Sequence, residues 1–442
     1  MPSECTRERS KDIFVEARNP DPLIHPFERA REMTRALNAT KLERLFAKPF
    51  VGALSGHVEG VYCLGRATDC LTKVISGSAD GDVRVWDVRN PKKTSLWSNS
   101  SAHSAFVRGV CFVPGSEGNR FLSCGDDQTV KLWDIKNQQN ELSCLQGKDN
   151  FTAVDHHWGH GLFATSSAGA TVDIWNYERA DPVQSYKWTG SADSLTTVRF
   201  NAVEQHVLAT AATDRSVILY DLRMQGPLTK VVLQMRTNAL AWNPMEAYYF
   251  ASANEDHRAY IFDMRRLDKA VNVLKDHVGA VMDVDFAPTG QELVTAGYDK
   301  TLRIYKTHSG HSRDVYHTNR MQRLFACKFS MDSQYILSGS DDGNVRIWKA
   351  QASVKSGILS EREKASRQYS DQLKERYADI PEIKRISNHR HTPKLIKNMA
   401  KGEKIERDAV ARKETNRRKN SKPGRLPEPK TIREDAVLAI KK

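Results

Sequence analysis

One short segment pattern recurs along residues 82–349, and this recurrence limits the fold more than any other feature of the sequence. Each copy alternates apolar and polar residues, ends on an aromatic residue and is usually followed by Asp. The aromatic residues of the copies are Trp86, Trp133, Trp175, Tyr220, Phe262, Tyr305 and Trp348. Their successive spacings of 47, 42, 45, 42, 43 and 43 residues match the roughly 40–45 residues of a four-stranded propeller blade. The sequence therefore predicts seven blades.

Each repeat also has room for the other strands of a blade. In the first repeat, the alternating runs GVYCLGRA and KVISGS precede the segment that ends at Trp86, and turn residues separate them. The run KPFVGAL at 48–54 stands before the first repeat, so we expect it to supply the outer strand of the last blade. Closure of this kind removes exposed sheet edges. The predicted fold is all-β: a seven-bladed WD-repeat β-propeller with a helical N-terminal arm and a basic α-helical C-terminal extension.

An acidic residue lies six positions before the aromatic residue in six of the seven repeats. These residues are Asp80, Asp127, Asp214, Asp256, Asp299 and Asp342, and Gly169 stands at this place in the third repeat. Three of them follow a histidine at a similar distance: His57 before Asp80, His103 before Asp127, and His277 before Asp299. An Asp in a tight turn can accept hydrogen bonds from turn amides and from such a histidine. We predict structural His–Asp pairs, and we expect the repeats without a histidine to depend more on packing.

The sequence contains none of the common catalytic motifs, neither a phosphate-binding glycine loop nor a GxSxG or HExxH motif. The most enzyme-like cluster, Asp155-His156-His157-Trp158, lies in the third repeat, and we interpret it as structural. The seven cysteines are scattered without a CxxC pair, and His389 and His391 have no third ligand nearby. We therefore predict no catalytic residue, cofactor, metal or small-molecule substrate. The polar N-terminus and short apolar runs predict an intracellular protein without membrane contact.

The positive charge of the chain is concentrated at its C-terminal end. Residues 351–442 hold 25 Lys and Arg and 13 Asp and Glu, a net charge of +12, whereas residues 1–350 hold 42 and 41, a net charge of +1. A nearly neutral domain with a cationic appendage is typical of a protein that contacts polyanions through that appendage. We predict an arm at 1–47, a propeller at 48–350 and a basic helical extension at 351–442.

Helical patterns flank the repeats on both sides. In the arm, Phe27, Ala30, Met33 and Leu37 share one helical face, and Thr40 is placed to cap a second short helix. We expect the first helix to fold back onto the propeller, with partner binding as the alternative, and residues 1–25 to be extended or disordered. In the extension, Ser360 and Glu363 form a capping-box pattern ahead of a helix. Apolar residues then follow at helical spacing: Ala365, Tyr369, Leu373 and Tyr377.

Beyond Thr392 the pattern predicts a basic, weakly amphipathic helix. Its candidate RNA-binding residues are Arg412, Lys413, Arg417, Arg418, Lys419, Lys422 and Arg425. Such a segment is a solvated helix, a nuclear-import patch or a binder of RNA phosphates, and we favour RNA binding or nucleolar retention. The region lacks aromatic residues for stacking on bases, which argues against sequence-specific reading of single strands.

Three repeats end in an aromatic-Asp-x-Arg sequence, at 86–89, 220–223 and 262–265. The last two lie in consecutive repeats and contain the pairs Asp221 and Arg223, and Asp263 and Arg265. The doubled pattern resembles the box of WD-repeat substrate receptors of cullin-RING ubiquitin ligases, whose arginine docks into the adaptor protein. The resemblance implies an adaptor contact through these residues. The alternative, which we favour, is that Asp-x-Arg serves the turn and a local salt bridge.

The two flanks narrow the comparison beyond WD repeats in general, which occur in many unrelated scaffolds. The stretches HPFERAREMTRALNATKLER at 25–44 and NHRHTPK at 388–394 are not propeller features. On them the chain resembles the Sof family of nucleolar WD-repeat proteins over nearly its whole length. The resemblance implies a non-catalytic component of the small-subunit processome, the nucleolar particle organised around a box C/D small nucleolar RNA.

Several partners and one location follow from that resemblance. It implies contacts with small-subunit processome proteins, and with precursor ribosomal RNA or box C/D small nucleolar RNA. It also implies a place in the nucleus and nucleolus. Because a propeller closes on itself, we expect a monomer within a large complex. The alternative function is that of a substrate receptor of a cullin-RING E3 ubiquitin ligase.

Overall fold

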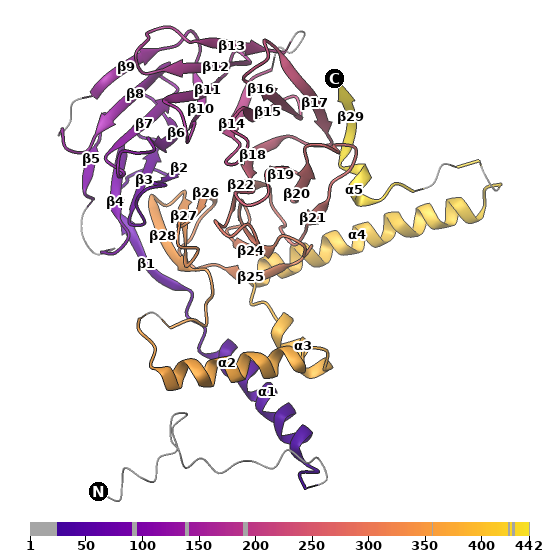
Figure 1. Cartoon of the computed structure of the whole chain (residues 1–442). Coiled ribbons are helices and arrows are strands. Elements are labelled where there is room, and N and C mark those ends of the chain that lie inside the picture. Colours follow the sequence, from indigo (N-terminus) through magenta and orange to yellow (C-terminus); the bar gives the residue numbers. More distant parts are fainter. Residues whose placement is uncertain are drawn as a thin grey trace, which may run out of the picture. The chain divides into compact units, whose positions relative to one another are not determined.

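The computed structural model describes residues 24–90, 95–137, 141–188, 193–355, 357–422, 425–426 and 429–441 (Figure 1). The chain divides into two compact units, residues 1–47 with 353–389 and residues 48–352 with 390–442. The extension expected at 351–442 is therefore shared between two units. The expectation for residues 1–25 falls almost entirely outside the described residues.

The larger unit contains seven antiparallel sheets, one for each repeat, and this confirms the predicted propeller (Figure 1). Blade 1 contains β2 (Val61–Arg66), β3 (Lys73–Ser78), β4 (Val83–Asp87) and β5 (Trp97–Asn99). Blade 2 contains β6 (Val107–Phe112), β7 (Arg120–Gly125), β8 (Thr129–Asp134) and β9 (Glu141–Gln146). Blade 3 contains β10 (Phe151–His156), β11 (Leu162–Ser167), β12 (Thr171–Asn176) and β13 (Gln184–Lys187). The first strand of each blade is the innermost one, and it contacts the first strand of the next blade.

The remaining four blades follow the same order. Blade 4 contains β14 (Leu195–Phe200), β15 (Val207–Ala212), β16 (Ser216–Asp221) and β17 (Pro227–Leu233). Blade 5 contains β18 (Thr237–Trp242), β19 (Tyr249–Asn254), β20 (Ala259–Asp263) and β21 (Asn272–Leu274). Blade 6 contains β22 (Val281–Phe286), β23 (Glu292–Gly297), β24 (Leu302–Lys306) and β25 (Ser312–Tyr316). Blade 7 contains β26 (Leu324–Phe329), β27 (Tyr335–Ser340) and β28 (Asn344–Lys349), with β1 (Phe50–Ser55) as its outer strand. The pairing of β1 with β28 confirms the predicted ring closure.

The repeated aromatic residue has two roles in the four blades where it is tryptophan, blades 1, 2, 3 and 7. The side chains of Trp86 and Trp348 are about 1% exposed and pack between blades. Each tryptophan indole also donates a hydrogen bond to a hydroxyl ten residues earlier, as Trp86 does to Ser76 at 2.7 Å and Trp348 to Ser338 at 2.8 Å. A buried indole N–H without a partner would be costly, so the hydroxyl on the second strand and the tryptophan on the third belong together.

Blade 4 has a fifth strand that the sequence patterns did not predict. The chain returns at its C-terminal end, where α5 (Ile432–Asp435) is followed by β29 (Val437–Lys441), and β29 pairs with β17. The buried side chains of Ala436 and Val437 join the apolar cluster shared by blades 4 and 5. We call Thr431–Lys441 the C-terminal clasp. The expectation of a basic helix throughout this region is wrong for the clasp.

The smaller unit is a cluster of three helices, α1 (Glu28–Leu45), α2 (Glu361–Arg376) and α3 (Pro381–Asn388). The core of this unit is formed by Ala36, Leu373 and Ile383. Helix α1 is continuous through Thr40, whose hydroxyl donates to the Ala36 carbonyl, so the predicted cap and second helix are wrong.

The face predicted for the arm helix is also wrong, since α1 buries Ala36 and Thr40, whereas Phe27 is 68% exposed. On the C-terminal side, the capping box of Ser360 and Glu363 is present, as predicted. Helix α4 (Lys394–Lys419) belongs to the larger unit. Within the described residues, none of the helices is long and apolar enough to cross a membrane.

Candidate interaction surfaces

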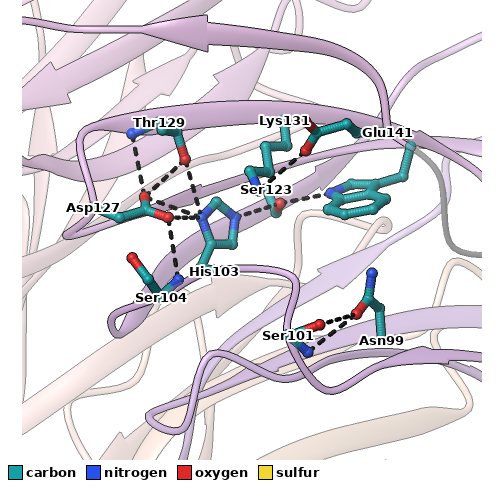
Figure 2. Close-up of polar contacts among 10 residues, drawn as sticks. Asn99, Ser101, His103, Ser104, Ser123, Asp127, Thr129, Lys131 and Glu141 are labelled. Atoms are coloured by element: carbon teal, nitrogen blue, oxygen red, sulfur yellow. Dashed lines mark hydrogen bonds and ion pairs between the residues drawn. The ribbon is translucent and has the colours of Figure 1, made fainter.

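The predicted His–Asp pair of blade 2 lies at the centre of a hydrogen-bond relay (Figure 2). The carboxylate of Asp127 contacts Nδ1 of His103 at 2.9 Å, and Nε2 of His103 contacts Oγ of Ser123 at 2.7 Å. The same Oγ accepts the indole N–H of Trp133 at 2.9 Å. Asp127 also accepts the amide and hydroxyl hydrogens of Thr129. The relay links two loops of the blade to its core, and it leaves no side chain free to act on a ligand.

Electrostatics favour the charged form of this aspartate. Burial raises the pKa of Asp127, but the hydrogen bond and positive potential from His103 and the hydrogen bonds from Thr129 outweigh it, and the pKa is lowered to about 2. Blade 6 contains an equivalent relay, in which Asp299 contacts His277 at 3.0 Å and His277 contacts Thr295 at 2.6 Å.

In blade 1 the structure corrects the predicted partner. His57 contacts Asp82 at 3.1 Å, not Asp80, and Arg84 also binds Asp82 at 2.6 Å. Asp80 accepts the amide of Asp82, which holds the turn. In blade 1, Asp82 thus binds the histidine and Asp80 holds the turn, whereas Asp127 does both in blade 2.

His57, Asp80 and Asp82 also form a group whose donor atoms lie within 4.8 Å of one another, close enough for a metal ion. The Asp82 carboxylate is engaged by Arg84, and Nε2 of His57 contacts Ser76 at 2.6 Å. We therefore interpret the group as a blade lock.

Blades without the histidine bind the turn aspartate in other ways. Asp214 binds Lys230 at 2.5 Å in blade 4, Asp342 binds Arg346 in blade 7, and Asp256 accepts the Tyr260 hydroxyl in blade 5. In blade 3 a Cβ on Gly169 would lie 2.0 Å from a carboxylate oxygen of Asp149, so the Asp149 carboxylate occupies the place of the missing side chain. These blades rely on specific polar contacts as well as on the packing that the sequence suggested.

The enzyme-like cluster of blade 3 is occupied by structural contacts. Asp155 accepts the Phe200 amide at 2.7 Å and binds Arg199 at 3.3 Å, which ties blade 3 to blade 4. Nε2 of His157 contacts the Gln205 carbonyl at 2.8 Å.

Helix α4 carries most of the cations proposed to bind RNA. Arg412, Lys413 and Arg417 are exposed on it, Arg418 is bound to Glu414 at 2.8 Å, and Lys422 and Arg425 lie beyond its end. By the 3.6-residue period these cations point in several directions. Another set of exposed cations of α4 is grouped on one side and occupies roughly a quarter of the helix circumference. We call it the basic stripe: Lys394, Lys397, Lys401, Lys404, Arg412 and Lys419.

The sequence patterns missed the first four residues of the stripe. They are separated by two or three uncharged or acidic residues each, so they do not stand out as a dense cluster of charge. Spacing along a helix provides the signal that would have done so. The opposite side of α4 holds Leu395 and Met399, 70% and 50% exposed, and three glutamates.

The Asp-x-Arg boxes present their arginines at equivalent turns of two consecutive blades. The Arg223 guanidinium makes two contacts with Asp221, at 3.0 and 2.7 Å, and its side chain remains 66% exposed. The Arg265 guanidinium contacts Asp263 at 3.1 and 2.9 Å, lies 4.0 Å from the Tyr248 ring centre, and is 54% exposed. In blade 1, Arg89 contacts its aspartate once, at 3.3 Å. Local salt bridges therefore exist, and they orient the arginines without covering them.

Two families match this chain. A Sof1-like domain matches residues 350–436, and the WD domain, G-beta repeat, matches 48–87, 94–134, 268–306 and 305–349. The Sof1-like match covers α2, α3, α4 and α5, and the WD matches cover the repeats with His–Asp locks and the last blade.

Similar proteins span nearly the whole chain. Protein SOF1 of Saccharomyces cerevisiae is 47% identical, covering 94% of this chain and 91% of the relative. DDB1- and CUL4-associated factor 13 of Xenopus laevis is 48% identical, covering 99% and 98%, and its Homo sapiens counterpart is 46% identical, covering 100% and 98%. Among solved structures, the WD40 propeller domain of Doa1 matches with a TM-score of 0.58 at 20% identity, covering 68% of this chain and 96% of that one. This last match shows the fold alone.

Proposed function

This chain belongs to the Sof1-like family of ribosome-biogenesis WD-repeat proteins, and from that premise we propose that it is a non-catalytic scaffold of the small-subunit processome. In this proposal the propeller binds neighbouring processome proteins. The basic part of the C-terminal extension binds precursor ribosomal RNA or box C/D small nucleolar RNA. The protein then acts in the nucleolus, as a monomer within the particle.

The observation that carries the RNA-binding part is the exposed basic stripe of α4. Its six cations lie on one side of a helix that extends over 26 residues, and one acidic residue, Asp408, lies among them. Lysine and arginine side chains on such a stripe neutralise phosphates and release counterions, which gives affinity without base specificity. A scaffold that must hold a folding RNA needs this kind of contact.

Substitution tests this proposal better than truncation. Removing residues 405–442 would also delete the C-terminal clasp and its strand, so a loss of binding would have two explanations. Reversing charge at Lys397, Lys401, Lys404 and Arg412 keeps the clasp, and glutamate retains high helix propensity. The matched control reverses four exposed cations of blades 2 and 3: Arg120, Lys136, Arg179 and Lys187.

The measurement is ultraviolet crosslinking in cells followed by sequencing of the attached RNA. We expect reads on the small-subunit precursor or its guide RNA, strongly reduced for the stripe variant and retained for the control. Equal crosslinking of the stripe variant and the control would overturn RNA binding by α4.

The Asp-x-Arg boxes favour a second function. The vertebrate relatives are named as associated with DDB1 and CUL4, and we propose that Arg223 and Arg265 dock such an adaptor. Both guanidinium groups are oriented by an aspartate and remain more than half exposed. The test is capture of purified DDB1 by the Arg223→Glu, Arg265→Glu double variant, with Arg89→Glu as the matched control. Retained capture by the double variant would sink this function and leave the scaffold function untouched.

A further inference from the structure

A groove of about 870 Å³ lies beside the clasp on the larger unit. Its walls come from the turn after β20, from the turn between β24 and β25, and from α5. We call it the clasp groove.

Cations of the clasp groove outnumber its available acids. Arg266 and Lys269 lie in the connection between β20 and β21, Lys275 follows β21, and Arg433 lies in α5; none of them forms an ion pair with a described residue. Of the two lining acids, Asp263 holds Arg265, and Glu434 accepts the Thr431 amide at 3.0 Å and keeps its charge. Four cations against one acid without an ion-pair partner leave the groove with an excess of positive charge.

The clasp builds one wall of the groove. The Ala270 amide donates to the Arg433 carbonyl at 3.0 Å, which fixes α5 against blade 5. On the far side the Lys275 amide donates to the Gly310 carbonyl at 2.9 Å. A Cβ on Gly310 would lie 3.0 Å from the Val273 carbonyl oxygen, so glycine lets this turn approach β21. Three of the cations are thus held on blade 5, and Arg433 joins them only when the clasp is docked.

The lining indicates the class of ligand. The aromatic lining residues of the groove are two histidines, His308 and His311, and His311 contacts Asp276 at 2.8 Å. Its more exposed apolar residues are Val271 and Ile432, at 41% and 42%. These apolar residues are partly exposed and do not form the kind of deep apolar pocket that anchors peptide side chains at protein interfaces. Separate cations on a polar frame suit a chain of phosphates.

We propose that the clasp groove binds the phosphate backbone of an RNA strand, as a second contact beside the basic stripe. This inference rests on the proposed RNA-binding function and gives it a second, rigid site. An acidic protein segment is the competing occupant. The two occupants differ in what they need: RNA needs only spaced cations, whereas a peptide also needs pockets for its side chains.

The test measures binding of purified full-length protein to fluorescein-labelled single-stranded RNA by fluorescence anisotropy across a salt series. The groove variant carries Arg266→Glu, Lys269→Glu and Arg433→Glu, and a milder version carries Arg266→Gln and Lys269→Gln. The side chains changed are exposed, and the clasp uses only the backbone of Arg433. The matched control carries Lys136→Glu, Arg179→Glu and Lys187→Glu, which gives the same change in charge.

We expect the groove variant to bind RNA about tenfold more weakly, and to lower the salt slope by about 2, since each phosphate contact to a single strand contributes about 0.7. The milder variant should fall between it and wild type, and the control should bind like wild type. If the stripe variant loses binding and the groove variant does not, the clasp groove is wrong and the RNA function stands. If neither loses binding, both fail. If the groove variant loses binding to labelled polyglutamate but not to RNA, the occupant is an acidic protein.

Discussion

Blade 2 connects its loops through a relay from Asp127 through His103 and Ser123 to Trp133, whereas blade 4 has neither the histidine nor the tryptophan. In blade 4 the turn aspartate is bound by a lysine of the outer strand, and a fifth strand comes from the C-terminal end of the chain. Both blades have the same four-stranded sheet at their centre. The difference teaches that blade 4, which lacks the internal lock, is held from its outer edge.

That difference matters for function because the clasp that supplies the fifth strand of blade 4 also contributes to the candidate RNA surface. The clasp that completes blade 4 forms a wall of the clasp groove and follows α4 in the chain. Blade 2, which has the internal lock, does not use its outer edge in this way. Weakening each lock in turn shows whether the two kinds of blade are held as differently as the contacts indicate.

The largest effect is expected from Asp127→Ala in blade 2. The change leaves the buried His103 ring and the Thr129 donors without their acceptor, and losing one partner of a buried charged network costs about 3 kcal/mol. We expect a lower melting temperature and faster amide hydrogen exchange in β6 and β7. Asp126→Ala is the control, since Asp126 forms a more exposed pair with Arg108. Equal effects of the two changes would mean that the relay does not lock the blade.

The next effect is expected from Val437→Asp in the clasp. A charge in the apolar cluster of blades 4 and 5 prevents docking of β29, and burial of one valine contributes about 1.5–3 kcal/mol. Amide exchange should accelerate in β17 and β21 and remain unchanged in blade 2. Leu438→Asp, at a side chain that is 53% exposed, should leave exchange unchanged. Unchanged exchange in β17 after Val437→Asp would show that blade 4 is complete without the clasp.

Sequence periodicity predicted the ring but not the clasp, for a physical reason. The aromatic residue recurs because every blade core needs it, so the period survives even where Trp is replaced by Tyr220 or Phe262. The clasp occurs once and has no period. Its signals in the sequence are a Thr431–Glu434 capping box and the apolar run at 437–440. Both are short and lie in a basic segment whose charge pattern predicted a helix.

The candidate site was predicted in part. Position relative to the aromatic residue identified Asp127 and Asp299 as partners of histidines, but in blade 1 it selected Asp80, because Asp82 is only two residues away. Which of two near aspartates meets the imidazole depends on the turn geometry and on Arg84, which no spacing rule contains. Likewise, charge density identified the end of α4, whereas the stripe depends on the direction of each side chain.

Blade 3 should respond to pH. Burial lowers the pKa of His156 to about 4. The Nε2 atom of this ring is buried and has no hydrogen-bond partner among the described residues, so a proton added there would lack an acceptor. Because the folded pKa lies below the ordinary value of about 6.5, the neutral ring stabilises the fold above that value, and stability falls as pH drops toward 4. We expect a loss of up to about 2 kcal/mol between pH 7 and pH 5. His156→Phe should flatten this part of the stability profile, and an unchanged profile would contradict the assignment.

The smallest effect is expected from Lys230→Met in blade 4. Burial raises the pKa of Asp214, but hydrogen bonds from Lys230 and Ser216 outweigh it, so the pKa is lowered overall. The ion pair therefore stabilises the fold above the ordinary carboxyl pKa of about 3.9 and is lost as pH falls below it. We expect Lys230→Met to cost about 1 kcal/mol at pH 7, and less as the pH falls through that range, by thermal unfolding. Lys187→Met, at an exposed lysine, is the control.

The pH dependence decides what Lys230 contributes. Its ammonium group also lies 5.7 Å from the centre of the Trp188 ring, and its stem is buried on blade 4. A penalty that persists after Asp214 is protonated would show that packing and the aromatic ring, rather than the ion pair, hold the outer strand. In that case blade 4 would be held without any counterpart of the His–Asp lock, and the clasp would be its main constraint. A penalty that disappears at low pH would make Lys230 the functional replacement for the missing histidine.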